Sequence, residues 1–187
     1  MIDTDGDGML LQDEVDKVRS LSNRGDSNNS IFQNNTKIVR FNEFARFTNL
    51  NKINSNSFAG CTNLVSITLP AGPTEIGAFV FQKCAHLEQL VIPEGYQVTG
   101  RGLCDNCSSL LLLNLPSTLQ TMGDGALFGL KNNVTVVCHA VTPPSFGTFN
   151  NNPLALYVPD ESVDAYKSAN GWSQYAKYIK PLSEYEG

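Results

Sequence analysis

A ten-residue pattern that recurs every 23 residues constrains the fold of this chain more than any other feature. The pattern starts at Cys61, Cys84 and Cys107 and ends on a proline each time. Its columns are Cys61/Cys84/Cys107, Leu64/Leu87/Leu110, Ile67/Leu90/Leu113, Leu69/Ile92/Leu115 and Pro70/Pro93/Pro116. A weaker fourth copy holds Leu130, Val136 and Cys138, and a further column holds Phe58, Phe81, Cys104 and Leu127. This period indicates a solenoid, because one such unit cannot bury its apolar side without a stacked neighbour.

Each copy contains a short segment with the character of a β-strand. In the first copy, Ile67 and Leu69 are expected to point into the coil while Ser66 and Thr68 face outward. Pro70 follows and should end the strand, because proline lacks the N–H that a sheet requires. We therefore expect a β-rich solenoid over residues 41–141, with one short strand in each repeat.

The repeats resemble the BspA-like leucine-rich repeats of surface proteins from Bacteroidetes-type bacteria. The resemblance covers roughly residues 44–140 and rests on the C-x-x-L-x-x-I-x-[LI]-P core, the preceding aromatic column, and the pairs Ile76-Gly77 and Met122-Gly123. Two features depart from the pattern, since the unit from Phe47 to Phe58 is short and Cys104 replaces a phenylalanine. The resemblance implies a leucine-rich repeat fold of the α+β, β-rich type, a place outside the cell or on its surface, and a part in adhesion.

Charge and hydropathy exclude several classes of partner. The formal net charge is −5 and the pI is about 4.9, which argues against nucleic acid or an anionic membrane surface as a partner. No apolar run approaches the roughly 18 residues of a membrane-spanning helix. Met1-Ile2 leads directly into an acidic loop without a secretion leader, so the resemblance to surface proteins implies that this chain is a mature fragment.

The acidic loop at residues 3–14 matches the calcium-binding pattern D-x-D-x-D-G-x5-E of an EF-hand. The pattern supplies carboxylates at positions 1, 3 and 5, a backbone carbonyl at position 7 and a bidentate glutamate at position 12. The candidate calcium ligands are Asp3, Asp5, Asp7, Met9 and Glu14. Too few residues precede the loop for an entering helix, which favours a structural calcium clip over a regulatory sensor. The alternative is an acidic loop that binds nothing.

Residues 1–40 are expected to form the N-terminal cap. Apolar residues at helical spacing predict an exit helix behind the calcium loop: Leu11, Val15, Val18 and Leu21. Residues 22–36 are polar and rich in turn formers, which predicts a loop. This loop contains Arg24-Gly25-Asp26-Ser27, the tetrapeptide that integrins bind in animal matrix proteins, although a solvated glycine turn is the simpler interpretation. Phenylalanines at three-residue spacing (Phe41, Phe44 and Phe47) predict a short helix over the first repeat.

Residues 142–187 lack the period and are expected to form a C-terminal strand-helix cap. The segment 154–159 reads as a final strand that ends at Pro159, and Asp160 or Ser162 could cap a helix from Val163 to Ala169. Aromatic residues of this segment, which resembles the C-terminal segments of the same family, would cover the last repeat: Tyr166, Trp172, Tyr175 and Tyr178.

The sequence does not predict an enzyme. The five cysteines include Cys104-x-x-Cys107, but four of the five occupy repeat columns, which favours packing over zinc or redox chemistry. Whether stacked cysteines are bridged is left open by the sequence. The two histidines, His86 and His139, belong to no recognisable catalytic motif.

Binding is the remaining interpretation, because solenoids bind partners on the concave face. The outward strand positions expected there are Lys52, Asn54, Ser66, Thr68, Gln89, Val91, Leu112, Asn114, Thr135 and Val137. This row lacks aromatic residues, which argues against a glycan platform, and Val91, Leu112 and Val137 could form an apolar stripe for a protein. The first hypothesis is a secreted or surface module that binds a protein ligand there. The alternatives are ordinary solvated strands, and a structural spacer or stalk within a larger surface protein.

Overall fold

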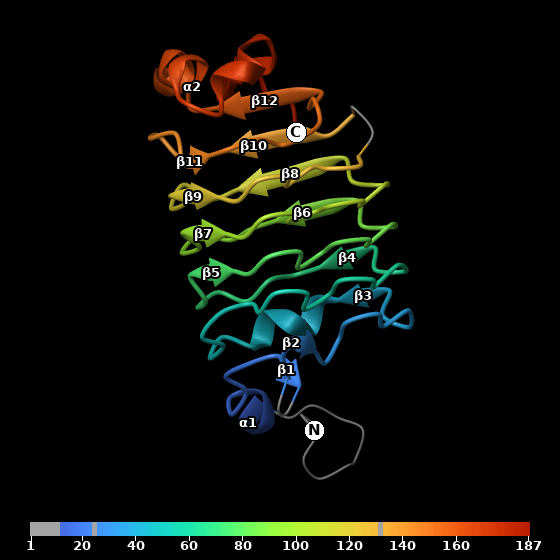
Figure 1. Cartoon of the computed structure of the whole chain (residues 1–187). Helices are drawn as coiled ribbons and strands as arrows, with labels where there is room; N and C mark the ends of the chain where they lie inside the picture. Colours follow the sequence, from blue (N-terminus) through green and yellow to red (C-terminus); the bar gives the residue numbers. More distant parts are fainter. Residues whose placement is uncertain (1–11, 24–25, 131–132) are drawn as a thin grey trace.

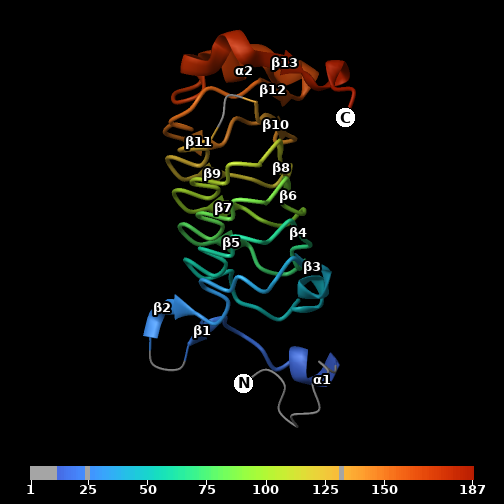
Figure 2. The ribbon, with the colours of Figure 1, turned by 90° about the vertical axis from the view of Figure 1, so that its right-hand side faces the viewer.

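The computed structural model describes residues 12–23, 26–130 and 133–187, although the side chains of 22–29 are not described. The repeats stack into a column with α1 (Gln12–Val15) at one end and α2 (Val163–Ser168) at the other (Figures 1 and 2). Five strands form one parallel sheet along this column, in the spatial order β13-β12-β10-β8-β6. Their bounds are β6 (Gln89–Val91), β8 (Leu112–Leu115), β10 (Thr135–Cys138), β12 (Ala155–Val158) and β13 (Ile179–Pro181).

Parallel register places the apolar columns of the repeats on the inner face of this sheet. Leu90 pairs with Leu113, Leu113 with Val136, and Val136 with Leu156. All four side chains are buried. On the N-terminal side of this sheet, β3 (Arg40–Phe41) and β4 (Ser66–Ile67) form a separate parallel pair, and β4 contacts β6.

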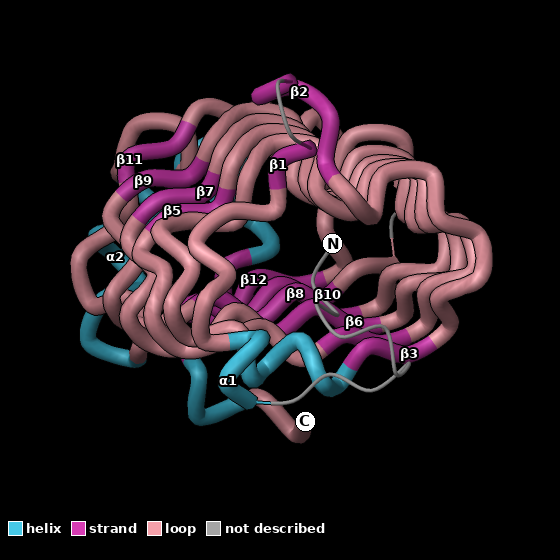
Figure 3. The backbone as a smooth tube through the Cα atoms, turned by 90° about the horizontal axis from the view of Figure 1, so that it is seen from below, coloured by secondary structure: helices cyan, strands magenta, loops and turns pink. Residues whose placement is uncertain are grey.

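A second parallel sheet lies on another side of the coil, as the view along the column shows (Figure 3). It contains β5 (Glu75–Ile76), β7 (Val98–Thr99), β9 (Thr121–Met122) and β11 (Ser145–Phe146). Ile53 extends this second sheet by pairing with Ile76, and Lys52 Nζ lies 3.6 Å from Glu75 Oε1. The expectation that Lys52 and Asn54 share a row with Ser66 is therefore wrong, and Arg40 is the residue that pairs with Ser66.

Stacked rings and thiols fill the interior. Phe32 stacks on Phe58 and Phe58 on Phe81, with centroid distances of 5.3 and 5.7 Å and nearly parallel planes. The Cys84 thiol donates to the carbonyl of Phe58 at 3.2 Å, and the Cys107 thiol donates to the carbonyl of Phe81 at 2.9 Å. Each thiol is a second donor to its carbonyl, because Cys61 N–H also donates to the Phe58 carbonyl and Cys84 N–H to the Phe81 carbonyl. All five cysteines are free thiols.

The N-terminal segment differs in part from its prediction. Residues 22–36 contain an antiparallel hairpin of β1 (Ser22–Asn23) and β2 (Asp26–Ser30), where the sequence predicted a loop. The 3-10 helix η1 (Asn42–Arg46) carries the buried Phe44, and the buried Phe47 follows it. The exit helix is described over Gln12–Val15, and Val15 and Leu21 are buried.

The C-terminal segment packs its aromatic rings on the last coil. It contains α2 and the 3-10 helices η2 (Asp160–Ser162), η3 (Ser173–Tyr178) and η4 (Leu182–Glu184). Trp172 Nε1 donates to the carbonyl of Pro144 at 2.8 Å, and Tyr166 donates to the carbonyl of Ala140 at 2.7 Å. Both rings are fully buried, so their polar atoms need these partners. Within the described ranges, no helix is long and apolar enough to cross a bilayer.

Candidate functional site

The expected ligand residues lie in two rows on the outward face of the larger sheet. Parallel pairing aligns Gln89, Leu112, Thr135 and Ala155 in one row. It aligns Val91, Asn114, Val137, Tyr157 and Lys180 in the next. Side chains alternate across a strand, so these rows stand opposite the buried leucine columns. These positions align in the register because their spacing in the sequence follows the repeat.

Ser66 and Thr68 continue the two rows toward the N-terminal end. Ser66 pairs with Arg40, whose Nη1 donates to Ser66 Oγ at 3.4 Å. Thr68 Oγ1 donates to Asn42 Oδ1 at 3.3 Å. The hydroxyl groups of this end are thus held by neighbouring polar side chains, and the surface there is polar.

Val91, Leu112 and Val137 do not form the continuous exposed apolar stripe that the sequence predicted. Val91 is 50% exposed and Leu112 is half-buried, but Val137 is fully buried. Val137 lies between Asn114 and Tyr157 in the register. The apolar surface available to a partner is therefore formed by Val91 and Leu112, and Val137 supports the sheet.

An aromatic pair that the sequence reasoning missed closes the C-terminal end of the rows. The Tyr157 ring lies 5.0 Å from the Tyr185 ring, and Lys180 Nζ lies 5.9 Å from the centroid of Tyr157. Tyr157 belongs to the row of Val137 through β12, although the spacing changes there from 23 to 20 residues. Extending the register through the final strand at Leu154–Pro159 would have identified it.

Most of the predicted calcium site falls on residues that the structure does not describe. Asp3, Asp5, Asp7 and Met9 lie outside the described ranges. Glu14 is described, and its side chain is 3% exposed, whereas the adjacent Asp13 is exposed.

The stacked cysteines have the raised pKa values expected of thiols in a packed interior. Burial is the main cause that raises the pKa of the Cys61 thiol to about 12. The hydrogen bond to Cys107 and burial raise the pKa of Cys84 far above its ordinary value. Protonated, buried thiols are poor nucleophiles and poor metal ligands. The cysteines therefore serve the fold, and the exposed His86 likewise makes a local contact of 2.7 Å between Nδ1 and the Thr62 carbonyl.

Comparison with known proteins gives a family match over most of the chain. The model of the BspA type leucine rich repeat region matches residues 26–153 in six copies. A solved leucine-rich repeat protein from Bacteroides ovatus ATCC 8483 is similar at 13% sequence identity, with a TM-score of 0.31. The match covers 81% of this chain and 62% of that one, so the chain spans less than two thirds of that protein's length. No curated protein matches the chain significantly.

Proposed function

Because this chain belongs to the BspA-type leucine-rich repeat family, we propose that it is a secreted or cell-surface module that binds a protein ligand. The ligand surface is the outward face of the sheet formed by β6, β8, β10 and β12. The observation that carries this proposal is the register, which presents Gln89, Val91, Leu112 and Asn114 as neighbours on adjacent strands. Repeat proteins characteristically use such extended sheet faces for binding.

The chemistry of this face suits a protein partner. Val91 and Leu112 provide a small apolar centre, while Gln89, Asn114 and Thr135 provide uncharged hydrogen-bonding groups around it. Interfaces are depleted of charge at the centre and polar at the rim. Tyr157 and Tyr185 add the kind of ring that concentrates binding energy in interfaces.

The two ends of the column are proposed as caps. Residues 1–40 would close the N-terminal end of the 23-residue repeats, with calcium held by Asp3, Asp5, Asp7, Met9 and Glu14 as a structural clip. Residues 142–187 would close the other end. Solenoids need such ends, because a terminal repeat otherwise exposes an apolar face. The complete D-x-D-x-D-G-x5-E pattern of residues 3–14 supports the calcium part of this proposal.

The binding proposal is tested on an array of extracellular-matrix proteins and mucins, probed in millimolar calcium. A hit is then measured with the double variant Val91→Ser/Leu112→Ser and with the control Val141→Ser. Val141 is 57% exposed and lies after β10, outside the sheet rows. We expect at least a tenfold loss of affinity in the double variant, about 1.4 kcal/mol or more, and no change in the control. Equal loss in both variants, or no loss in either, would contradict the proposed surface.

A second candidate function is a spacer within a larger surface protein. The observation in its favour is the shape, since α1 and α2 lie at opposite ends of the stacked column (Figure 2). A chain of this form could hold other domains apart. The same array separates the two functions, because a spacer gives no protein hit and no effect of substitutions on the sheet face.

A further inference from the structure

Phe79 has a backbone conformation that a phenylalanine rarely adopts. Its φ is +56°, in the left-handed region. The equivalent positions of neighbouring repeats are Asn56, Gly102 and Gly125, with φ between +59° and +71°. Asparagine and glycine tolerate this region, but a bulky side chain is strained there. Strain of this kind persists in proteins mainly where function requires a particular side chain.

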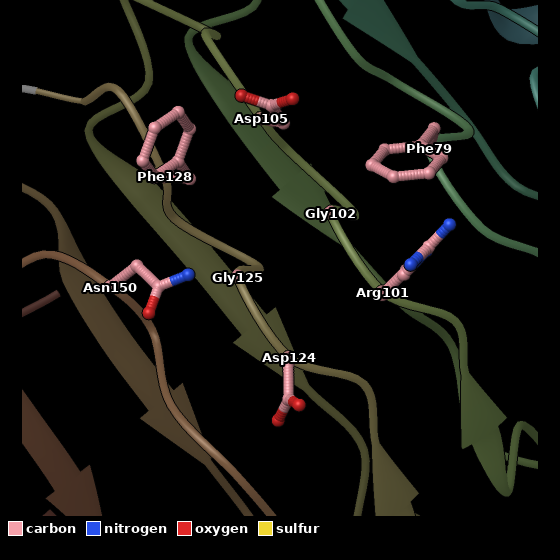
Figure 4. A pocket seen from close by; sticks show the side chains of 8 residues that line it. All are labelled: Phe79, Arg101, Gly102, Asp105, Asp124, Gly125, Phe128 and Asn150. Atoms are coloured by element: carbon pink, nitrogen blue, oxygen red, sulfur yellow. The ribbon is translucent and has the colours of Figure 1, made fainter.

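The Phe79 ring forms one wall of a groove among the turns of successive coils (Figure 4). The ring lies against Gly102, since a Cβ at Gly102 would come within 2.4 Å of the ring carbons. Phe128 forms the opposite wall and is 52% exposed. Gly102 and Gly125 lie between the two rings, and the groove encloses about 310 Å³.

The rim of the groove offers both hydrogen-bond acceptors and donors. Asp105 is 8% exposed and is held by Gln82 Nε2 at 2.6 Å and by Asn106 Nδ2 at 2.5 Å. Asp124 lies on the far side of the groove from Asp105, and its exposed carboxylate points away from the two rings (Figure 4). Arg101 lies 5.1 Å from the centroid of Phe79 and provides guanidinium donors. Asn150 lines the same groove and can both donate and accept.

We propose that this groove binds one saccharide ring, such as the terminal residue of a glycan. A sugar ring has an apolar C–H face that packs on aromatic walls, and hydroxyl groups that both donate and accept. A cationic side chain would be repelled by Arg101, while both carboxylate oxygens of Asp105 already accept from Gln82 and Asn106. An apolar side chain could pack on the walls but would make no hydrogen bond with Arg101 or Asn150. The volume lies at the lower end of ligand pockets, which fits a single ring rather than a longer chain.

The saccharide site does not depend on the protein-binding function proposed for the sheet face, because the two sites use different residues. The expectation that glycans are disfavoured concerned the sheet rows, where exposed aromatic residues were not expected. Phe79 and Phe128 lie instead in the turns that connect the second sheet to the next strand. A glycan site here could act together with a protein site on the sheet or without it.

The test begins with the purified chain on an array of glycans that end in neutral hexoses, N-acetylhexosamines, deoxyhexoses, uronic acids or sialic acids. Each class is also offered as the free methyl glycoside at high millimolar concentration and followed by saturation-transfer NMR. Binding of the free glycoside shows recognition of one ring, whereas binding on the array alone requires a longer glycan and overturns the single-ring proposal. Silence in both measurements also overturns it.

Variants then locate the site. Phe79→Asn installs the residue type found at position 56, so the variant should fold with an unchanged or higher melting temperature. Because it lacks the aromatic wall, it should bind the glycoside at least tenfold more weakly. Phe128→Ala should lose affinity similarly, while Val141→Ala and Val91→Ser/Leu112→Ser should bind as the parent does. Retention of binding by Phe79→Asn and Phe128→Ala would overturn the site.

Arg101→Gln distinguishes a saccharide from a cationic peptide. It removes a donor for hydroxyl groups, so we expect several-fold weaker saccharide binding. An oligolysine peptide serves as the competing probe. If that peptide binds at Phe128 and binds more tightly after Arg101→Gln, the groove is a cation site and the saccharide proposal is wrong.

Discussion

At the scale of single residues, the cysteine column shows how a repeat meets two requirements with one side chain. The thiols of Cys61, Cys84 and Cys107 are small enough for the packed interior, and each donates to a backbone carbonyl of the preceding coil. The sequence predicted the packing role from the column alone. It could not predict the hydrogen bonds, because they depend on carbonyls that lie 26 or 29 residues away.

The buried thiols predict a loss of stability at alkaline pH. The pKa of Cys61 rises from 9.0 to about 12 in the folded protein. Above about pH 9 the unfolded chain therefore releases a proton that the native state keeps, and the free energy of unfolding falls until about pH 12. Below pH 9 the Cys61 thiol makes its full contribution to the free energy of unfolding. Urea unfolding between about pH 8 and pH 10 should show a slope that Cys61→Ala reduces, by up to about 1.4 kcal/mol per pH unit. An identical slope in both proteins would contradict this prediction.

Close stacking of the coils predicts a steric cost at Gly100. A Cβ there would lie 2.5 Å from Ala78 N and from the Gly77 carbonyl carbon, both of which are backbone atoms that cannot move aside cheaply. We expect Gly100→Ala to lower the free energy of unfolding by about 2 kcal/mol or more. Gly95 is the control, because nothing lies within 4 Å of its added Cβ and only its φ of +100° opposes the change. Gly95→Ala should cost about 1 kcal/mol. Urea titrations of both variants measure the difference, and an equal cost would exclude the steric explanation.

At the scale of elements, the sequence predicted the strands that the 23-residue columns mark. It missed the short strands of the second sheet and the β1–β2 hairpin, which those columns do not mark. The inward leucines and the outward positions of β6 and β8 follow from alternation. The second sheet has strands of two residues, too short for alternation to be visible, and only pairs such as Ile76-Gly77 marked it. The β1–β2 hairpin was missed because serine, asparagine and aspartate have low strand propensity.

The candidate sites also contain features that the sequence predicts and features that only the structure shows. The sheet rows were predictable, because alternation and a fixed period locate outward residues. The burial of Val137 was not, because alternation predicts an outward position and not the exposure that remains after packing. The groove of Phe79 was visible only as an odd residue in the column Asn56, Phe79, Gly102 and Gly125, and its meaning needed the backbone conformation.

The calcium-loop pattern, whose last residue Glu14 lies in α1, predicts that calcium stabilises the fold. Extracellular calcium sites bind at about 0.1 to 1 mM, so millimolar calcium should stabilise the fold by no more than about 1 to 2 kcal/mol. We expect a modest rise of the melting temperature in calcium relative to chelator, followed by calorimetry. Glu14→Gln and Asp3→Ala should abolish the rise, since each removes a ligand. Asp13→Asn is the matched control, because Asp13 is exposed and adjacent to Glu14 but is no ligand of the pattern. The same melting curve with and without calcium in the parent protein would refute the site.

At the scale of the whole molecule, each coil packs chiefly on the coils beside it. The sheets pair β6 with β8, β8 with β10, and β10 with β12, and the Phe32–Phe58–Phe81 stack links the first coils through the interior. Stability in such a column is approximately a sum of coil and neighbour contributions. Cooperative unfolding therefore depends on every interface between coils being strong enough.

A substitution in the middle of the column should separate the unfolding of its two ends. Phe81 is fully buried and stacks on Phe58, so Phe81→Ala should cost about 3 to 5 kcal/mol at one interface. Trp172 is the only tryptophan and lies in the C-terminal segment, so its fluorescence reports that end, while far-UV circular dichroism reports the whole chain. In the parent protein the two urea transitions should coincide. In Phe81→Ala the dichroism should begin to change at a lower urea concentration than the fluorescence, because the N-terminal coils lose their support first. Coincident transitions in the variant would mean that coupling extends beyond neighbouring coils, and the column would then unfold as one unit despite its repeat construction.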